Sequence, residues 1–415
     1  MKMEGIMSKV IAVNSGSSSL KFQVFDMPSE TVLTSGQAER IGQEMGAFTI
    51  KVNGEKKTQE LPIADHQVAV DLMLKELVEN NIVASLDEIK GAGHRIVQGG
   101  SYFSGSVEVN EDVVNKVEEL SDLAPLHNPA HLVCYRALCK ALPNIKHVFV
   151  FDTAFHQTMT EESYLFPVPY EWYENYKVRS YGAHGTSHWY VNRRTAEILN
   201  KNVEEMNMIT CHLGNGASIT AIRNGKVINT SMGLTPLGGI MMGTRCGDID
   251  PTVVFYMEEK LHATPEDMDN YLNKKSGMLG VSGISSDCRD IEAAYNKGDE
   301  RAIRTMNLYI NRIVNVVGGY FAQLGHVDAI AFTAGIGEND SLVREKVCQG
   351  LEECMGLSVD YEANKNCHGE ELVISKKDSK VDVVVCPTNE ELVIARDTVR
   401  ILGLSYGLLC IIRRN

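Results

Sequence analysis

Two segments of the chain share a pattern in which an apolar strand runs into a small polar loop and returns as a second strand. The first segment is residues 9–26, where "NSGSSS" separates two apolar runs. The second is residues 208–229, where "HLGNGAS" takes the same position and an Asn-Gly pair marks a further hairpin turn. We interpret the two segments as a faint internal duplication, with one copy at the start of each of two domains. A chain of 415 residues is also too long for one ordinary hydrophobic core.

Strand-like and helical patterns alternate along the rest of the chain. Near-continuous apolar runs occur at 147–151, 328–333 and 381–386, which is typical of strands buried on both faces of a mixed sheet. Helical periodicity covers 66–80 and 300–324. This alternation predicts an α/β fold, and we place the boundary between the domains near residue 150.

The composition excludes several classes of partner. The formal net charge of −14 gives the chain no general attraction for nucleic acid or for an anionic membrane surface. An anionic substrate would therefore need a local cluster of Arg and Lys. The ten cysteines form no CxxC pair, which favours reduced thiols in the cytoplasm over a metal site or a disulfide framework. No stretch approaches the ~20 apolar residues that span a bilayer, and we see no signal peptide.

Four loops have a composition suited to phosphate binding. Glycine and serine let backbone N–H groups approach an anion, and the first loop adds Lys21 as a cation. The second loop is residues 212–218, and the third, "TAGIGEN", follows a buried strand directly. The fourth is residues 233–251, a Gly-, Pro- and Thr-rich segment that contains Arg245. Each loop taken alone could equally be a tight turn or a packed irregular segment.

Isolated polar residues in tight settings strengthen the phosphate interpretation. They are Arg95 in "GHRIVQGG", Asp152 after an apolar strand, His184 in "YGAHGTSH", Asp287 and Arg289 in "SSDCRD", and Glu390 in "PTNEEL". Each alone could be a structural salt bridge or a helix cap. Together with the loops they favour phosphoryl transfer, which needs hydrogen-bond donors and cations around phosphates and a carboxylate or amide to hold Mg²⁺.

These motifs resemble those of the acetate kinase family. The likeness rests on "VNSGSSSLKF", "GHRIVQGG", "FDTAFHQTM", "YGAHGTSH", "HLGNGAS", "GLTPLGGIMMGTRCGDIDP", "FTAGIGEN" and "PTNEELVIARDT", which run from about Val10 to about Arg400. The resemblance implies two ribonuclease-H-like domains of the actin-like ATPase fold, with the active site in the interdomain cleft. It implies an N-terminal domain of residues 1–150 plus 387–415 and a C-terminal domain of residues 151–386. A homodimer through the second domain is also implied.

The family's reaction is a reversible phosphoryl transfer from ATP to acetate that gives ADP and acetyl phosphate, with Mg²⁺ or alternatively Mn²⁺. By matching motifs, the metal ligands would be Asn14 and Glu390, and the catalytic residues would be Arg95, Asp152, His184 and Arg245. The nucleotide would meet Ser17, Ser19, Lys21, His212, Leu213, Gly214, Asn215, Gly216, Asp287, Cys288, Arg289, Gly335, Ile336, Gly337, Glu338 and Asn339.

The family assigns Asp152 as an acid or base, and elementary chemistry qualifies that role. The substrate of the family, acetic acid, is a carboxylic acid with a pKa near ~4 and is already ionised at pH 7, so this nucleophile needs no general base. We expect Asp152 to orient an arginine or a metal-bound water instead.

The resemblance implies a substrate pocket near Val97, Leu126, Ala183 and Pro236, in which Arg95 would hold the acetate carboxylate. Val97 suits acetate, because a smaller residue there would suggest propionate. Gln98 stands where the family motif commonly has histidine, and we expect this change to tune the site.

Three other functions stay open at this point. One is a propionate or butyrate kinase, which kcat/KM on a series of acids would distinguish. A second is an actin- or chaperone-like ATPase, whose ATP hydrolysis would not respond to acetate. The third is a catalytically inactive sensor. The presence of all six catalytic and metal-binding residues argues against this function.

Overall fold

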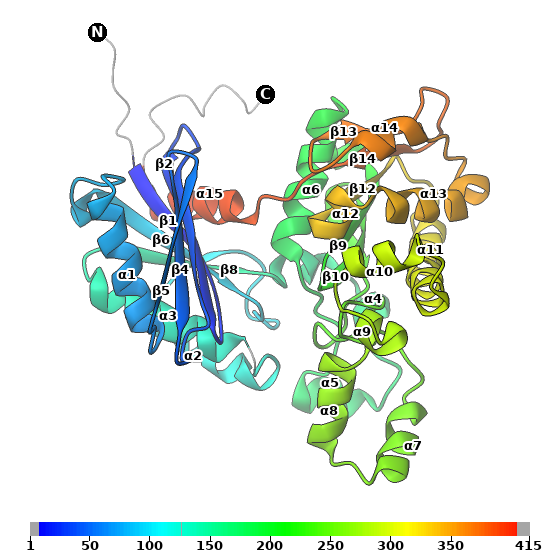
Figure 1. Ribbon diagram of the computed structural model, residues 1–415, viewed down its shortest axis with the longest axis horizontal. Coiled ribbons are helices and arrows are strands. Elements are labelled where there is room, and N and C mark those ends of the chain that lie inside the picture. The colour runs from blue at the N-terminus through cyan, green and yellow to red at the C-terminus, as the bar shows by residue number, and fades with distance from the viewer. Residues whose placement is uncertain (1–7, 126, 405–415) are drawn as a thin grey trace. The chain divides into compact units, whose positions relative to one another are not determined.

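The computed structural model describes residues 8–125 and 127–404, and the chain divides into two compact units (Figure 1). The first unit takes the chain up to Ala154 and again from Asn389, and the second spans Phe155–Thr388. The break at 154 lies four residues after the boundary that we predicted near residue 150. The C-terminal return to the first unit begins two residues after the predicted residue 387.

The first unit is built on an eight-stranded mixed sheet with the order β5-β4-β3-β2-β1-β6-β8-β7. Its strands are β1 (Ser8–Gly16), β2 (Ser19–Met27), β3 (Thr31–Glu39), β4 (Gly46–Val52), β5 (Glu55–Leu61), β6 (Ile89–Ile96), β7 (Val107–Glu108) and β8 (Lys146–Phe151). Its helices are α1 (His66–Glu79), α2 (Glu111–Glu119), α3 (Asn128–Ala141) and α15 (Glu390–Leu402). Helices α1 and α3 pack against the sheet and each other, and α15 packs on β1, β6 and β8.

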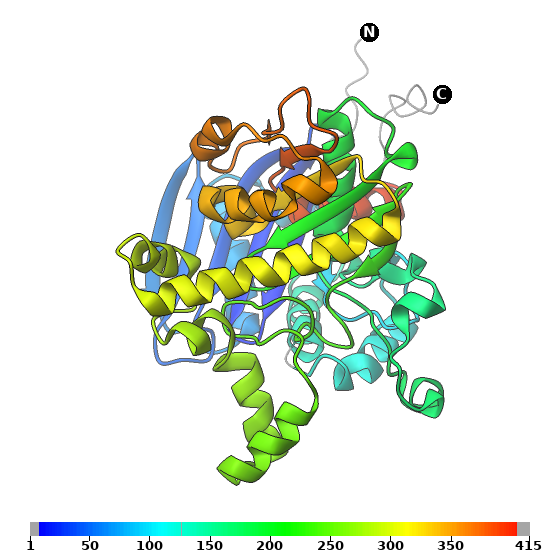
Figure 2. The ribbon, with the colours of Figure 1, turned by 90° about the vertical axis from the view of Figure 1, so that its right-hand side faces the viewer.

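The second unit has a six-stranded mixed sheet with the order β11-β10-β9-β12-β14-β13. Its strands are β9 (Asn207–Leu213), β10 (Ala217–Arg223), β11 (Lys226–Thr230), β12 (Ala329–Thr333), β13 (Leu372–Val373) and β14 (Asp382–Val385). Its helices are α4 (Glu161–Tyr164), α5 (Tyr170–Tyr176), α6 (Gly185–Ile198), α7 (Thr252–Leu261), α8 (Pro265–Lys274), α9 (Gly277–Ser282), α10 (Cys288–Tyr295), α11 (Glu300–Leu324), α12 (Ala334–Asn339), α13 (Ser341–Met355) and α14 (Tyr361–Asn366). Helix α6 packs on β9 and β12, whereas the long helix α11, yellow in Figure 2, packs on β9 and β10.

The two sheets repeat one topology. In the first unit β1 is antiparallel to β2 and parallel to β6, which is parallel to β8. In the second unit β9 is antiparallel to β10 and parallel to β12, which is parallel to β14. The predicted α/β class with two similar domains is confirmed, and the two hairpins that suggested a duplication occupy equivalent places in the two sheets.

Sequence patterns did not predict every element. Strand β5 is half-exposed at its last residue and exposed at every other position, so it carries no apolar period, and its pairing with β4 alone makes it a strand. The predicted turn "TAGIGEN" is instead the end of β12 followed by the short helix α12. Within the described residues no helix has the length and apolar character that crossing a membrane requires.

Candidate active site

The loop between β1 and β2 is a two-residue hairpin turn. Gly16 pairs with Ser19, so Ser17 and Ser18 form the turn, and Asn14 pairs directly with Lys21 across the two strands. The imidazole Nε2 of His66 lies 2.8 Å from the carbonyl oxygen of Gly16 and ties this loop to α1. The hairpin therefore presents the predicted serines and Lys21 at the end of the first unit's sheet.

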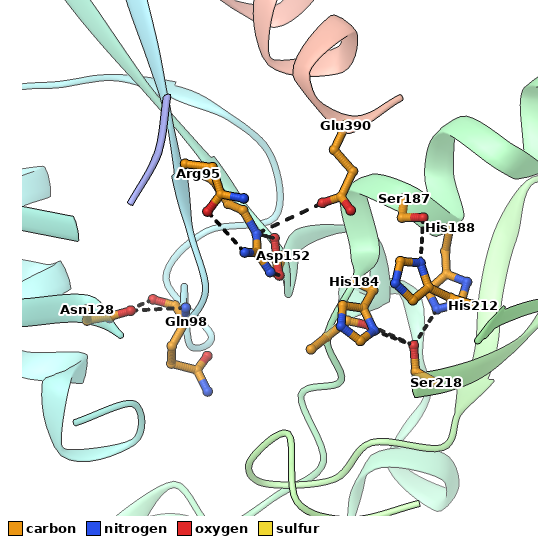
Figure 3. Close-up of polar contacts among 12 residues, drawn as sticks. Arg95, Gln98, Asn128, Asp152, His184, Ser187, His188, His212, Ser218 and Glu390 are labelled. Atoms are coloured by element: carbon orange, nitrogen blue, oxygen red, sulfur yellow. Dashed lines mark hydrogen bonds and ion pairs between the residues drawn. The ribbon is translucent and has the colours of Figure 1, made fainter. Parts of the chain in front are cut away.

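Arg95 is the centre of a charged cluster in the first unit (Figure 3). Its Nε and Nη2 atoms donate to the two carboxylate oxygens of Asp152 at 3.0 and 2.6 Å, and its Nη1 donates to Asn14 Oδ1 at 3.2 Å. The Oε2 atom of Glu390 lies 3.9 Å from Arg95 Nε. Strands β1 and β6, the residue that follows β8 and the first residue of α15 thus bring four predicted site residues together.

Burial and neighbouring charge shift the ionisation of this cluster. Burial alone would lower the pKa of Arg95, but the carboxylates of Asp152 and Glu390 outweigh it and raise that pKa, so the guanidinium stays charged. Burial raises the pKa of Glu390 to about 7, with Arg95 opposing the shift and Asp152 adding to it. A partly buried carboxylate with a raised pKa is a common feature of functional sites.

The same cluster fits a magnesium ion in its donor chemistry. Oε2 of Glu390 is buried and has no hydrogen-bond partner in the described part of the chain, and both Glu390 and the amide oxygen of Asn14 lie against Arg95. Mg²⁺ takes oxygen ligands, typically from one or two protein groups together with phosphates and water. No group of three or more His, Cys, Asp or Glu side chains that could hold a metal occurs in the described residues, so the protein would supply only part of the coordination shell.

Gln98 is held in the loop after β6. Its backbone N–H donates to Asn128 Oδ1 at 3.2 Å, and the Asn128 amide donates back to the Gln98 carbonyl oxygen at 3.0 Å (Figure 3). Its own side-chain oxygen accepts from the Gly100 N–H at 2.8 Å. Gln98 thereby shapes the loop next to Val97, which is buried. Leu126, also predicted for the substrate pocket, lies outside the described residues.

In the second unit, His184 and Arg245 meet over the loop between β9 and β10. A Cβ atom built on Gly216 would lie 3.4 Å from Arg245 Nη1 and 3.5 Å from His184 Nε2, so both donors face this glycine. The ring of His184 also stacks on that of His212, with centroids 4.1 Å apart. Arg245 Nη1 donates to the Pro236 carbonyl oxygen at 3.1 Å, and burial lowers the pKa of Arg245. Ala183, the remaining predicted pocket residue, is buried beside His184.

A cavity of about 630 Å³ lies at the end of the second unit's sheet. Its volume is within the range of small-ligand sites. Eight of the predicted nucleotide-binding residues line it: Gly214, Asn215, Asp287, Cys288, Arg289, Gly335, Ile336 and Asn339.

Three further residues that line the cavity were missed by sequence reasoning. Ser286 and Asp340 each adjoin a predicted residue, and Glu292 stands one helical turn after Cys288 on α10. Helical spacing from Cys288 is a signal that could have found Glu292.

Other predicted nucleotide-binding residues are buried or bonded within the protein. Leu213 and Gly337 are buried, and Glu338 Oε1 accepts from the backbone N–H groups of Ala334 and Thr388. The cavity residue Cys288 is buried, and its thiol donates to Asp340 Oδ2 at 3.3 Å. Burial, with Asp340 adding to it, raises the pKa of that thiol, so Cys288 stays protonated and acts as a packing group.

The chain is similar to known proteins along nearly its whole length. The acetokinase family model matches residues 9–396. The acetate kinase of Bacillus mycoides is 55% identical over 395 residues, which is 95% of this chain and 99% of that protein. The crystal structure of Porphyromonas gingivalis acetate kinase has a TM-score of 0.91 at 47% identity and covers 95% of this chain and 100% of its own. A propionate kinase structure from Francisella tularensis has a TM-score of 0.90 at 39% identity, with the same coverage.

Proposed function

The chain belongs to the acetokinase family, and from this premise we propose that it catalyses reversible transfer of the γ-phosphoryl group from ATP to acetate, giving ADP and acetyl phosphate. The observation that carries the proposal is the 55% identity to an acetate kinase over 95% of the chain. The charged cluster around Arg95 and the cavity in the second unit supply groups of the kinds that this reaction needs.

Acetate reaches the enzyme as a carboxylate at neutral pH, so its attack needs no base. Attack on a phosphate is opposed by repulsion between two anions, which a cation beside the acceptor offsets. We assign this role to Arg95, whose guanidinium offers a fork of donors that matches a carboxylate. The bidentate contact with Asp152 holds that guanidinium in one orientation, which supports Asp152 as a positioning residue.

Asn14 and Glu390 would hold the Mg²⁺ ion that accompanies ATP, with Mn²⁺ as an alternative. When bound, this ion neutralises charge on the phosphate oxygens. Lys21 and the serines of the β1–β2 turn would meet the phosphates from the same hairpin.

His184 and Arg245 would donate to the oxygens of the phosphoryl group as it moves in line between the two anions. Their shared approach to Gly216 supports this assignment, because that glycine belongs to a loop that lines the nucleotide cavity at Gly214 and Asn215.

The test is an assay of acyl phosphate by trapping with hydroxylamine, using ATP, Mg²⁺ and a series of short-chain acids. We expect acetyl phosphate as the main product and loss of the signal when EDTA removes the metal. A failure to form acyl phosphate from any acid would overturn the proposal.

Propionate is the second candidate acceptor, because a propionate kinase matches this structure nearly as closely as an acetate kinase does. A higher kcat/KM on propionate than on acetate would favour it. The buried Val97 favours acetate.

A cytoplasmic homodimer completes the proposal. The nine cysteines in the described residues are free thiols, which suits a reducing compartment. Helix α7 of the second unit buries none of its residues, and exposes 68% of Phe255 and 58% of Tyr256. Large exposed aromatics of this kind mark contact surfaces, and we assign this one to a second copy of the chain.

A further inference from the structure

A buried chain of polar side chains begins at His184 and leads away from the donors that face Gly216 (Figure 3). His184 Nδ1 lies 2.8 Å from Ser218 Oγ, which lies 2.8 Å from His188 Nε2. His188 Nδ1 in turn lies 2.7 Å from Thr210 Oγ1. His188 is one turn after His184 on α6, and Ser218 and Thr210 come from β10 and β9.

The surroundings of this chain restrict its protons. Ser218, His188 and Thr210 are all completely buried. Burial, with His156 and His212 nearby, lowers the pKa of His188 well below its ordinary value, so its ring is neutral and carries one N–H. Each hydroxyl also has a single proton.

Only one assignment of these protons both satisfies the three short contacts and gives each hydroxyl proton an acceptor at normal hydrogen-bond length. Thr210 donates to His188 Nδ1, His188 Nε2–H donates to Ser218, and Ser218 donates to His184 Nδ1. The reverse direction would leave the Thr210 hydroxyl proton without a hydrogen-bond acceptor among the described contacts. A third arrangement would turn the Ser218 proton to the Ala183 carbonyl oxygen, which lies at 3.4 Å, beyond normal O–H···O length.

We propose that Ser218, His188 and Thr210 are positioning residues that fix His184 as its Nε2–H tautomer. Nδ1 then accepts from Ser218, and the proton sits on the nitrogen that faces Gly216 beside Arg245. In the opposite tautomer Nε2 would present a lone pair to the phosphoryl oxygens and would repel them. This inference rests on the proposed phosphoryl transfer for its catalytic consequence, but the tautomer itself does not depend on it.

The first experiment reads the tautomer directly. Two-bond ¹H–¹⁵N correlation spectra of the full-length protein, labelled with ¹⁵N-histidine, distinguish a protonated Nε2 from a protonated Nδ1, and His184→Gln identifies the signal. We expect the Nε2–H form of His184 in wild type and in Thr210→Ser, and a mixture of forms in Thr210→Val. An Nδ1–H form in wild type would overturn the inference, and so would an unchanged spectrum in Thr210→Val.

The second experiment measures the kinetic consequence. Ser218→Ala should lower kcat roughly 10- to 100-fold while the KM values for ATP and acetate change less than about 3-fold. Thr220→Val is the matched control, because Thr220 is two residues further along β10, is completely buried and bonds to Thr230 and His156 instead. Equal kcat losses in the two variants would indicate a merely structural effect and would overturn the inference.

The two proposals fail separately. If wild-type protein forms no acyl phosphate from any acid, the proposed function falls, whereas the spectra still decide the tautomer. If acetyl phosphate forms but the spectra show the Nδ1–H form, only the positioning role falls.

Discussion

Arg95 has a contact geometry that a lysine cannot reproduce. Two of its nitrogens donate to Asp152 and a third donates to Asn14, so one planar guanidinium contacts both the positioning residue and a candidate metal ligand. Arg95→Lys keeps the charge but loses this fork, and we expect turnover to fall more than ~10²-fold, or ~2.7 kcal/mol in the barrier. Steady-state kinetics with acetate and ATP measure the effect.

Arg396→Lys is the matched control for that variant. Arg396 also makes a bidentate contact, to Glu30, elsewhere in the first unit. Its replacement should leave turnover near the wild-type value. Near-normal turnover in Arg95→Lys would contradict the assigned role.

Replacing Gly216 should affect activity without affecting stability. An added Cβ would meet Arg245 and His184 at ordinary contact distances, so the fold should tolerate alanine, but the methyl group would occupy the space that both donors face. We expect Gly216→Ala to lower kcat/KM for ATP at least ~10-fold. The melting temperature should stay within about 2 °C of wild type.

Gly277→Ala should behave in the opposite way. Gly277 has φ +62°, and its Cβ would lie 2.2 Å from the Met242 carbonyl oxygen, so alanine there should lower the melting temperature. A Gly216→Ala enzyme of full activity would show that no ligand approaches this loop.

Helix α15 couples a helix cap to the candidate metal site. The side chain of Asn389 accepts from the Leu392 N–H, and the next residue, Glu390, begins the helix. Asn389→Ala should cost about 1 kcal/mol of stability and loosen Glu390. The Mg²⁺ concentration for half-maximal activity should then rise about 3-fold or more, which a metal titration of activity measures.

Asp299→Ala supplies the comparison, because Asp299 caps α11 in the same manner by accepting from the N–H groups of Arg301 and Ala302. It should cost a similar stability without altering the Mg²⁺ requirement. An unchanged requirement in Asn389→Ala would count against Glu390 as a ligand.

Strands β6 and β8 bury two histidines whose Nε2 (His94) and Nδ1 (His147) atoms lie 3.0 Å apart. Burial lowers the pKa of His147 to about 4, against ~6.5 in the unfolded chain. As the pH falls, His147 therefore binds a proton in the unfolded chain before it does so in the folded protein. The stability gained from burying a neutral His147 is fully present above pH 6.5 and is lost as the pH falls toward 4. Between pH 7.5 and 5.5 the loss is about 1.4 kcal/mol.

Denaturant unfolding at those two pH values tests this. His147→Gln should lose about 1.4 kcal/mol less than wild type over the interval. His262→Gln, at an exposed histidine, should match wild type. The same pH dependence in His147→Gln as in wild type would contradict the argument.

Strands and helices with a clear apolar period were predictable from the sequence. Helix α11 begins at Glu300 and ends at Leu324, as its apolar pattern predicted. Strands β3 and β5 are largely polar, because one face or both faces meet solvent, and only hydrogen bonding to neighbours defines them. The polar chain behind His184 depends on the register that sets Ser218 opposite His212, which no single-sequence pattern reports.

The repeated topology explains why two similar hairpins carry different chemistry. In both hairpins a small polar loop joins the two strands. Asn14 pairs with Lys21 across the first hairpin, whereas His212 pairs with Ser218 across the second. The first unit offers a cation and an amide oxygen, and the second offers imidazoles and a cavity of about 630 Å³. A common fold thus supplies two loop positions, and the side chains at those positions decide what each unit binds.

The surface of helix α7 carries the prediction about assembly. Burial of Phe255 and Tyr256 against a second copy would remove apolar area that is otherwise exposed to water. The double variant Phe255→Glu with Tyr256→Glu should therefore convert the proposed dimer to a monomer, because two carboxylates would be desolvated in the interface. Sedimentation velocity measures the mass of each form. Tyr102→Ser, which removes an exposed aromatic residue of the first unit, should leave the dimer intact, whereas a monomeric wild-type protein or a dimeric double variant would rule out this surface.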